Sequence, residues 1–562
     1  METSRKKNDT FYIKNNILIG QETLNLDEKN CINIGELILK SFESNSNFIG
    51  QVNAITKEVN TFEDMRGKSV KCALWMQKLG VQPNDVIMIC TNNHLDAYVP
   101  FLAALYIGAI VSPLDQYFAE DNLSYFLEQV KPVMLFIDEK FYEIAYRSAN
   151  QLNLLKNIPN PTIIAFHEIK NKDLLNKYNN LSTLEKIIND YYDIISVKHF
   201  SCAKVVNMKS TAMILFTSGT TAFPELVKIP HLAFMAPSDQ QAPNMLKNDI
   251  ALLFESLCFI NGIFITIQAI LLQVTIIRIK IQFDAEVACI LIEKFKVTWA
   301  FLETSMCYHL INDKSYDRKK YDVSSLRTIV FTGSTIQSYK VHEELKAWLP
   351  KTSILQAYSL TETGIIAYQR ESGKIESSGY VSADVQLKFI SLNSPDQLLG
   401  PNMYGEICCI SPYMMGGQEL DDFSNSNKLL ISIWFKTGDI GYYDEDGNIY
   451  IIERIKYFLE VKNNQLSPTI FENILYNYPE VFEAVIIYVP SHNNDKYVIA
   501  FVTKMSGIEV TEMELKQLVT KDSSNNELRN VIFLPYLPRF SNGKINRKLL
   551  YKMARNIFYE ST

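Results

Sequence analysis

The sequence lacks any Cys-x-x-Cys pair, although nine cysteines are scattered over its 562 residues. Structural zinc sites and disulfide frameworks use cysteines at short, repeated spacings, so neither is predicted. The thiols are instead expected to be buried, in a reducing compartment. None of the seven histidines forms a metal-ligand pair, and His231 is expected to open a helix after Pro230.

The chain also lacks an excess of positive charge and an uninterrupted membrane-length apolar run. Its net charge of −7 argues against nucleic acid as the main partner. Residues 1–10 lack the apolar core of a secretory signal, so none is expected. The apolar run 260–281 is broken by Asn261, Gln268 and Gln273, and its end is β-branched. It therefore predicts a buried helix and a buried strand, with no transmembrane segment.

No repeat and no low-complexity linker divides the chain, so its organisation has to be inferred from periodicity. A single core stops growing near ~250 to 300 residues, so this length predicts several cores. Strand-like segments over 86–90, 109–114 and 133–137 alternate with helical ones over 95–107 and 121–130, and alternation resumes from 212 to about 407, as in α/β folds. After Arg454 a smaller unit follows, with a helix from Pro468 and paired strands over 485–489 and 497–503. We predict a large N-terminal domain of several subdomains (1–454) and a small, mobile α+β C-terminal domain (455–562).

A cluster of small hydroxyl residues follows the apolar strand 212–216. A strand that runs into such a loop presents backbone N–H groups and hydroxyls to an anion, here a phosphate. The residues are Thr217, Ser218, Gly219, Thr220 and Thr221.

Three further motifs supply groups that an ATP site needs. Tyr358 offers an aromatic face for adenine, Thr361 a hydroxyl for a phosphate, and Glu362 a carboxylate for Mg²⁺. The alternative for this segment is a helix start capped by Thr361. Asp439 lies in Thr-Gly-Asp, fifteen residues before Arg454, with an Asp-Gly hairpin predicted between them. The alternative is an ordinary turn and a surface ion pair.

Lys544 lies in the last motif, Ser-Asn-Gly-Lys-Ile over 541–545. The alternative for this segment is a solvated basic tail. In this order, across some 330 residues, the motifs resemble those of the adenylate-forming superfamily, which includes acyl-CoA synthetases, 4-coumarate–CoA ligases and beetle luciferases.

The resemblance implies a role for each candidate residue. The loop 217–221 would hold the ATP phosphates, Gly333 and Tyr358 the adenine, Thr361 a phosphate, Glu362 the Mg²⁺, Asp439 the ribose hydroxyls, and Arg454 the ribose or a phosphate. Lys456 would be the hinge of the C-terminal domain. Lys544, with Thr361 and Glu362, would be catalytic.

Some residues depart from the family pattern. Ala222 and Glu225 replace a glycine and a lysine of the phosphate loop, and Asn463 replaces a glycine of the turn that serves thioester formation. An anion at 225 is expected to weaken ATP binding without abolishing it.

The function implied is ATP-dependent conversion of a carboxylic acid to acyl-AMP, and then to a CoA thioester, by a monomer using ATP, Mg²⁺ and coenzyme A. A fatty acid is expected because the segment 256–263 is apolar and offers no charge to an amino acid's ammonium group. The alternatives are a luciferase-like monooxygenase acting through a luciferyl adenylate, and a nucleotide-binding pseudoenzyme. The resemblance implies an intracellular protein and suggests peroxisomes, although the C-terminus is not of the Ser-Lys-Leu type; the cytoplasm is the alternative, and the sequence does not choose between the two compartments.

Overall fold

The computed structural model describes residues 11–23, 32–91, 94–167, 169–170, 177, 182–217, 224–280, 282–333, 338–370, 373–414, 434–455, 459–461, 464–466, 468–490, 496–522, 528–540 and 543–559. Five predicted site residues lie outside these ranges: Ser218, Gly219, Thr220, Thr221 and Lys456.

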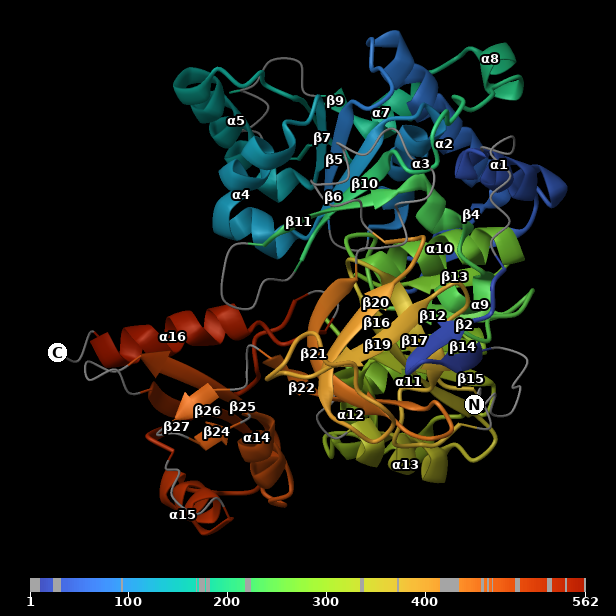
Figure 1. Cartoon of the computed structure of the whole chain (residues 1–562). Helices are drawn as coiled ribbons and strands as arrows, with labels where there is room; N and C mark the ends of the chain where they lie inside the picture. Colours follow the sequence, from blue (N-terminus) through green and yellow to red (C-terminus); the bar gives the residue numbers. More distant parts are fainter. Residues whose placement is uncertain are drawn as a thin grey trace.

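The first lobe is built on a seven-stranded sheet, at the top of Figure 1. Its strands, in order, are β11 (Leu226–Pro230), β10 (Thr211–Phe216), β6 (Ile110–Leu114), β5 (Val86–Cys90), β7 (Met134–Ile137), β8 (Thr162–Ala165) and β9 (Ser182–Thr183). Successive side chains of β5 enter different cores: Ile87 and Ile89 pack in the core on one face of the sheet, whereas Met88 and Cys90 pack in the core on the other face.

The helices of this lobe cover both faces of the sheet. They are α1 (Ile34–Ser44), α2 (Phe62–Lys78) and α3 (Tyr98–Tyr106) on one face, and α4 (Gln116–Val130) and α5 (Tyr142–Lys156) on the other, with the short η1 (Leu95–Ala97), η2 (Glu139–Phe141), α7 (Leu184–Asn189) and α8 (Ile194–Lys198) between elements. The predicted strand 86–90 is confirmed. The helix predicted over 121–130 begins earlier, because the Asp115 carboxylate accepts from the Tyr117 amide and caps it.

The second lobe is a nine-stranded sheet. Its strands are β18 (Tyr380–Val381), β17 (Gly364–Tyr368), β16 (Ser353–Leu360), β15 (Thr328–Thr332), β14 (Trp299–Glu303), β12 (Ile250–Leu253), β13 (Thr275–Arg278), β3 (Ile49–Asn53) and β4 (Val59–Thr61). The helices around it are α9 (Ser238–Gln241), α10 (Ile260–Leu272), α11 (Ala285–Phe295), α12 (Thr304–Asn312) and α13 (Ser338–Trp348), with η3 (His231–Met235) and η4 (Arg318–Lys320).

Helix α10 explains the long apolar run. Ile263 and Ile267 pack in the core of the first lobe, whereas Ile265 and Ala269 pack in the core of the second. A helix buried between two cores is apolar all round. The buried helix and strand predicted here are confirmed, and within the described ranges no helix is long and apolar enough to cross a membrane.

A six-stranded antiparallel sheet completes the large domain. Its strands are β1 (Phe11–Lys14), β2 (Ile17–Gly20), β19 (Gln386–Ile390), β20 (Gly405–Ile410), β21 (Phe435–Tyr443) and β22 (Ile449–Arg454). The hairpin predicted between Asp439 and Arg454 is confirmed as β21–β22. Asp444 organises its turn by accepting from the Asn448 amide at 2.9 Å.

The smaller C-terminal unit lies beside the large domain, at the lower left of Figure 1. Its elements are β23 (Leu459–Val461), β24 (Asn464–Leu466), α14 (Pro468–Tyr476), β25 (Val481–Pro490), β26 (Lys496–Lys504), α15 (Glu512–Asp522), β27 (Asn530–Phe533) and α16 (Arg547–Tyr559). The strands predicted as paired form the antiparallel β25–β26 ladder. The predicted α/β class, with a large N-terminal and a small C-terminal domain, is confirmed.

Candidate active site

The candidate site lies where the parallel strands β14, β15 and β16 end at one edge of the nine-stranded sheet. Ligands of α/β sheets usually bind at this edge. Glu303 ends β14 opposite Thr332 of β15, and Gly333 follows with φ +120°. Residues other than glycine rarely adopt this φ, and a Cβ at 333 would also lie 2.4 Å from Glu303 Oε1, so the position favours glycine.

Asp439 is the centre of a buried polar cluster at this edge. Its Oδ2 accepts from the Tyr358 hydroxyl at 2.5 Å, and its Oδ1 lies 2.7 Å from Arg454 Nε. Asp439 and Arg454 are direct cross-strand partners in β21–β22, because the hairpin between them brings the two ends of this segment together. Burial, together with the Asp439 charge, holds the pKa of Tyr358 well above its usual range, so Tyr358 stays a donor.

Thr361 and Glu362 lie in the turn that joins β16 to the antiparallel β17. The alternative of a helix start capped by Thr361 is therefore wrong. Gly364, with φ +70°, allows the tight reversal into β17. Both Thr361 and Glu362 are half-buried, at the end of the strand that carries Tyr358. They offer a hydroxyl and a carboxylate, which are the oxygen donors that Mg²⁺ accepts alongside phosphates and water.

Thr217 lies at the base of the predicted phosphate loop, at the end of β10. Its amide donates to the Glu225 carbonyl at 3.0 Å, and its hydroxyl accepts from the Glu225 amide at 3.2 Å. These bonds close the base of the loop between β10 and β11. The Glu225 side chain is exposed at this base.

Lys544 lies in a segment that rests on the start of α12, directly after Glu303. The Ser305 hydroxyl lies 3.4 Å from the Gly543 carbonyl, and a Cβ at 543 would lie 2.4 Å from Met306. The loop that carries Lys544 is therefore packed against the helix that starts at the site edge.

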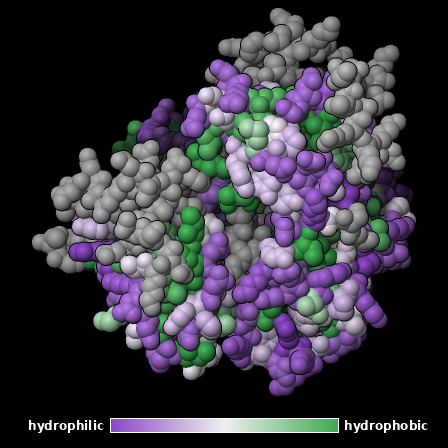
Figure 2. Space-filling view, turned by 60° about the horizontal axis from the view of Figure 1, so that its bottom comes forward, coloured by the Kyte–Doolittle hydropathy of each residue, from purple (hydrophilic) through white to green (hydrophobic). Residues whose placement is uncertain are grey.

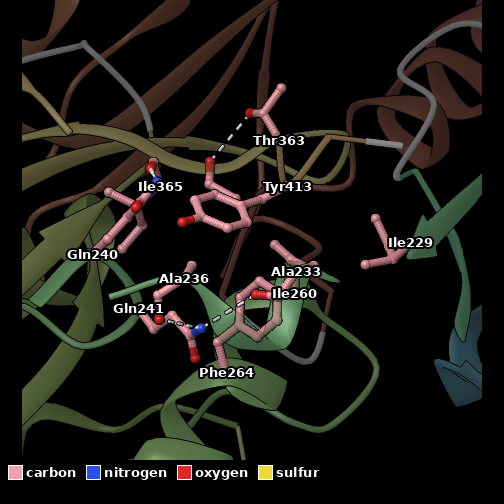
Figure 3. A pocket seen from close by; sticks show the side chains of 11 residues that line it. Ile229, Ala233, Ala236, Gln240, Gln241, Ile260, Phe264, Thr363, Ile365 and Tyr413 are labelled. Atoms are coloured by element: carbon pink, nitrogen blue, oxygen red, sulfur yellow. Dashed lines mark hydrogen bonds between the residues drawn. The ribbon is translucent and has the colours of Figure 1, made fainter. Parts of the chain in front are cut away.

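A narrow pocket adjoins Thr363 and Gly364, immediately after Glu362 (Figure 3). It is lined by Ile229, Ala233, Ala236, Gln240, Gln241, Ile260, Phe264, Thr363, Gly364, Ile365 and Tyr413. Gln241 is satisfied by three backbone carbonyls and by Gln268, whereas Gln240 Oε1 has no hydrogen-bond partner among the described residues. Gln240 is 4% exposed, so this acceptor is directed at buried space.

Sequence reasoning missed three polar residues at this site. Asn261 donates to the Ser359 hydroxyl at 3.2 Å, and Glu303 and Arg539 lie beside the Lys544 loop. Of these three, only Glu303 could have been identified from the sequence, because a carboxylate at the end of an apolar strand is typical of a ligand-binding edge.

Comparisons with known proteins agree with this geometry. A 4-coumarate–CoA ligase of Humulus lupulus is 26% identical over 518 residues, which cover 89% of this chain and 90% of that protein. A luciferin 4-monooxygenase of Photuris pensylvanica is also 26% identical, over 92% of this chain and 93% of that protein. The solved luciferase-like enzyme of the nonluminescent mealworm Zophobas morio is 27% identical, with a TM-score of 0.66, over 78% of this chain and 99% of that one.

The AMP-binding enzyme family matches residues 47–417, about two thirds of the chain. This range contains the seven-stranded and nine-stranded sheets, the predicted phosphate loop, and the strands β15 and β16 that precede Gly333 and Thr361. The chain therefore belongs to the AMP-binding enzyme family, with 4-coumarate–CoA ligases and luciferases among its relatives.

Proposed function

We propose that this protein activates a carboxylic acid with ATP to give acyl-AMP and pyrophosphate, and then transfers the acyl group to coenzyme A. The observation that carries the proposal is the cluster of Asp439, Tyr358 and Arg454 at the sheet edge that also holds Gly333 and, across α12, the Lys544 loop. In the first step the substrate carboxylate attacks the α-phosphorus and pyrophosphate leaves. In the second, the CoA thiolate attacks the acyl carbonyl and AMP leaves.

Each residue has a proposed task in the first step. Thr217 and its loop, with Thr361, bind phosphate oxygens, while Asp439 accepts from the ribose hydroxyls and Tyr358 and Gly333 lie beside adenine. Lys544 neutralises the charge that develops as the carboxylate attacks. Glu362 would hold Mg²⁺, which supplies charge neutralisation on the phosphates when it is bound. A domain boundary after Arg454 and a hinge at Lys456 belong to this proposal.

The pocket of Figure 3 is proposed to be where the body of the acid enters, and it must widen on binding because its cavity of about 10 Å³ holds no more than a water molecule. Its walls are largely apolar and none of its described lining residues is charged, which supports a medium or long-chain fatty acid over an amino acid. A hydroxylated acid is proposed to be preferred over its unsubstituted form, because its hydroxyl can donate to Gln240 Oε1, a buried acceptor with no partner in the part of the chain that the structure describes.

The similarity to a luciferin 4-monooxygenase supports a second candidate, oxidation of a luciferyl adenylate by O₂. It differs from the first only after the adenylate has formed. Light emission on addition of luciferin, ATP and O₂ distinguishes the two.

The test is ATP–pyrophosphate exchange over a panel of saturated fatty acids, their hydroxylated forms, aromatic acids and amino acids. We expect exchange with fatty acids and faster exchange with the hydroxylated members. Exchange with amino acids alone would contradict the substrate proposal. A chain that binds ATP but supports no exchange with any acid would be a pseudoenzyme.

Replacing Glu225 with lysine is expected to lower the KM for ATP about five- to tenfold. The Glu225 side chain is exposed at the base of the proposed phosphate loop. A lysine there would attract the ATP phosphates that the glutamate repels, and solvent would partly screen both interactions. The KM for ATP, measured by exchange at two salt concentrations, checks this. Glu445→Lys, on the distant β21–β22 turn, is the matched control, and an equal change in both variants would contradict a local effect.

A further inference from the structure

Arg539 lies at the junction between the C-terminal unit and the large domain, five residues before Lys544. Its Nη1 donates to the Gly543 carbonyl at 2.6 Å and to the Ser305 hydroxyl at 2.8 Å. Its Nη2 forms an ion pair with Glu483 of β25. One guanidinium therefore joins the Lys544 loop, the body of its own domain and the first turn of α12.

The groups that contact Arg539 have further polar partners of their own. Burial acts to raise the pKa of Glu483, but Arg539 and then His309 outweigh it and lower this pKa to about 2, so Glu483 remains charged. His309 Nε2, on α12, lies 3.1 Å from the same carboxylate. Glu303 accepts from the Ser305 amide at 2.7 Å, which ties this cluster to the edge that holds Gly333.

Aromatic contacts surround this polar junction. Tyr308 of α12 lies 5.5 Å from Tyr476 and 5.7 Å from Phe482, between ring centroids, and Phe540 lies 5.5 Å from Phe118 of α4. Apolar contacts of this kind tolerate sliding, whereas a planar guanidinium with three directed bonds fixes both distance and orientation. Arg539 is thus one of the polar groups that fix the register of the interface, together with His309 beside Glu483 and with Thr469, whose hydroxyl donates to Glu453.

We propose that Arg539 is a positioning residue: it seats the Gly543–Lys544 loop on α12 and so holds the domain arrangement that forms acyl-AMP. It acts through Lys544 and needs no contact with substrate. The inference rests on the proposed function for its kinetic consequence alone. Since the seating serves the first step, its loss should slow adenylation and spare thioester formation.

The kinetic test separates the two half-reactions in Arg539→Ala, using decanoic acid or whichever acid of the panel supports exchange. We expect ATP–pyrophosphate exchange to fall about a hundredfold in kcat with an unchanged KM for ATP, as for a misplaced catalytic group. Conversion of supplied decanoyl-AMP and CoA to the thioester should stay within threefold. Arg539→Lys should recover part of the adenylation rate, because a lysine can keep the ion pair with Glu483 but cannot also make both hydrogen bonds of the guanidinium to Gly543 and Ser305.

Arg529→Ala is the matched control, since Arg529 stacks on Tyr497 within the C-terminal unit and is away from this junction. An equal loss in both half-reactions, or a loss in the control as large as in Arg539→Ala, would overturn the proposal.

Hydrogen–deuterium exchange on the full chain without nucleotide gives a readout independent of activity. In Arg539→Ala we expect at least tenfold faster exchange at the start of α12 and over 543–546, with β26 unchanged. Unchanged exchange at both segments would also overturn the proposal. If the parent protein activates no acid, the proposed function fails and this measurement alone decides the role of Arg539.

Discussion

Replacing Lys544 with alanine is expected to slow acyl-adenylate formation by about a hundredfold or more, equivalent to roughly 3 kcal/mol of transition-state stabilisation. The loop before it is held by Arg539, Ser305 and Met306 at the start of α12, so the cation is delivered to one place. As we propose for Lys544, the charge that develops on the attacked phosphate would meet a cation that is already in place. ATP–pyrophosphate exchange at saturating acid and ATP measures the loss.

Lys552→Ala controls for a general loss of positive charge, because Lys552 is exposed on α16 of the same domain. It should exchange at the parental rate. The proposed role of Lys544 is contradicted if its alanine variant, folded by circular dichroism, retains exchange within threefold of the parent.

The Asp439→Asn variant is expected to bind ATP about a hundredfold more weakly. The carboxylate accepts from Tyr358 and Arg454, and we propose that it also accepts from the ribose hydroxyls. An amide turns one acceptor into a donor that faces these donors, and two charge-assisted bonds are weakened, each worth about 1.5–3 kcal/mol. Calorimetric titration with ATP gives the dissociation constant.

A nucleotide comparison identifies the group that Asp439 contacts. The parent should prefer ATP to 2′,3′-dideoxy-ATP strongly, whereas Asp439→Asn should bind the two nearly alike. Asp446→Asn is the control, since that side chain is 71% exposed on the hairpin turn. A variant that keeps the full preference for ATP would show that the ribose is bound elsewhere.

Much of this site is predictable because its geometry is local. Asp439 and Arg454 face each other since a short acidic turn with Gly447 at φ +85° forces the chain back on itself, and turn residues are visible in sequence. The alternating segments over 86–137 likewise predict their parallel sheet, because crossover connections leave few topologies.

Other features depend on contacts between distant segments, which periodicity does not encode. The β2–β19 pairing joins Leu18 to Leu387, and nothing near either residue specifies the other. The Thr361 segment was ambiguous because a threonine suits both a helix cap and a turn, and only the pairing of β16 with β17 decides. In the sequence nothing distinguishes Arg539 from other basic residues, because its partners Glu483 and Ser305 lie far from it along the chain.

The aromatic contact between α12 and the C-terminal unit has a consequence for the order in which the chain is made. Tyr308 is only 7% exposed, and its ring contacts are with Tyr476 and Phe482, which leave the ribosome more than 160 residues later. Until then the nascent large domain lacks the two rings that contact Tyr308 beside its site edge. A chain stopped after Arg454 would lack these contacts permanently.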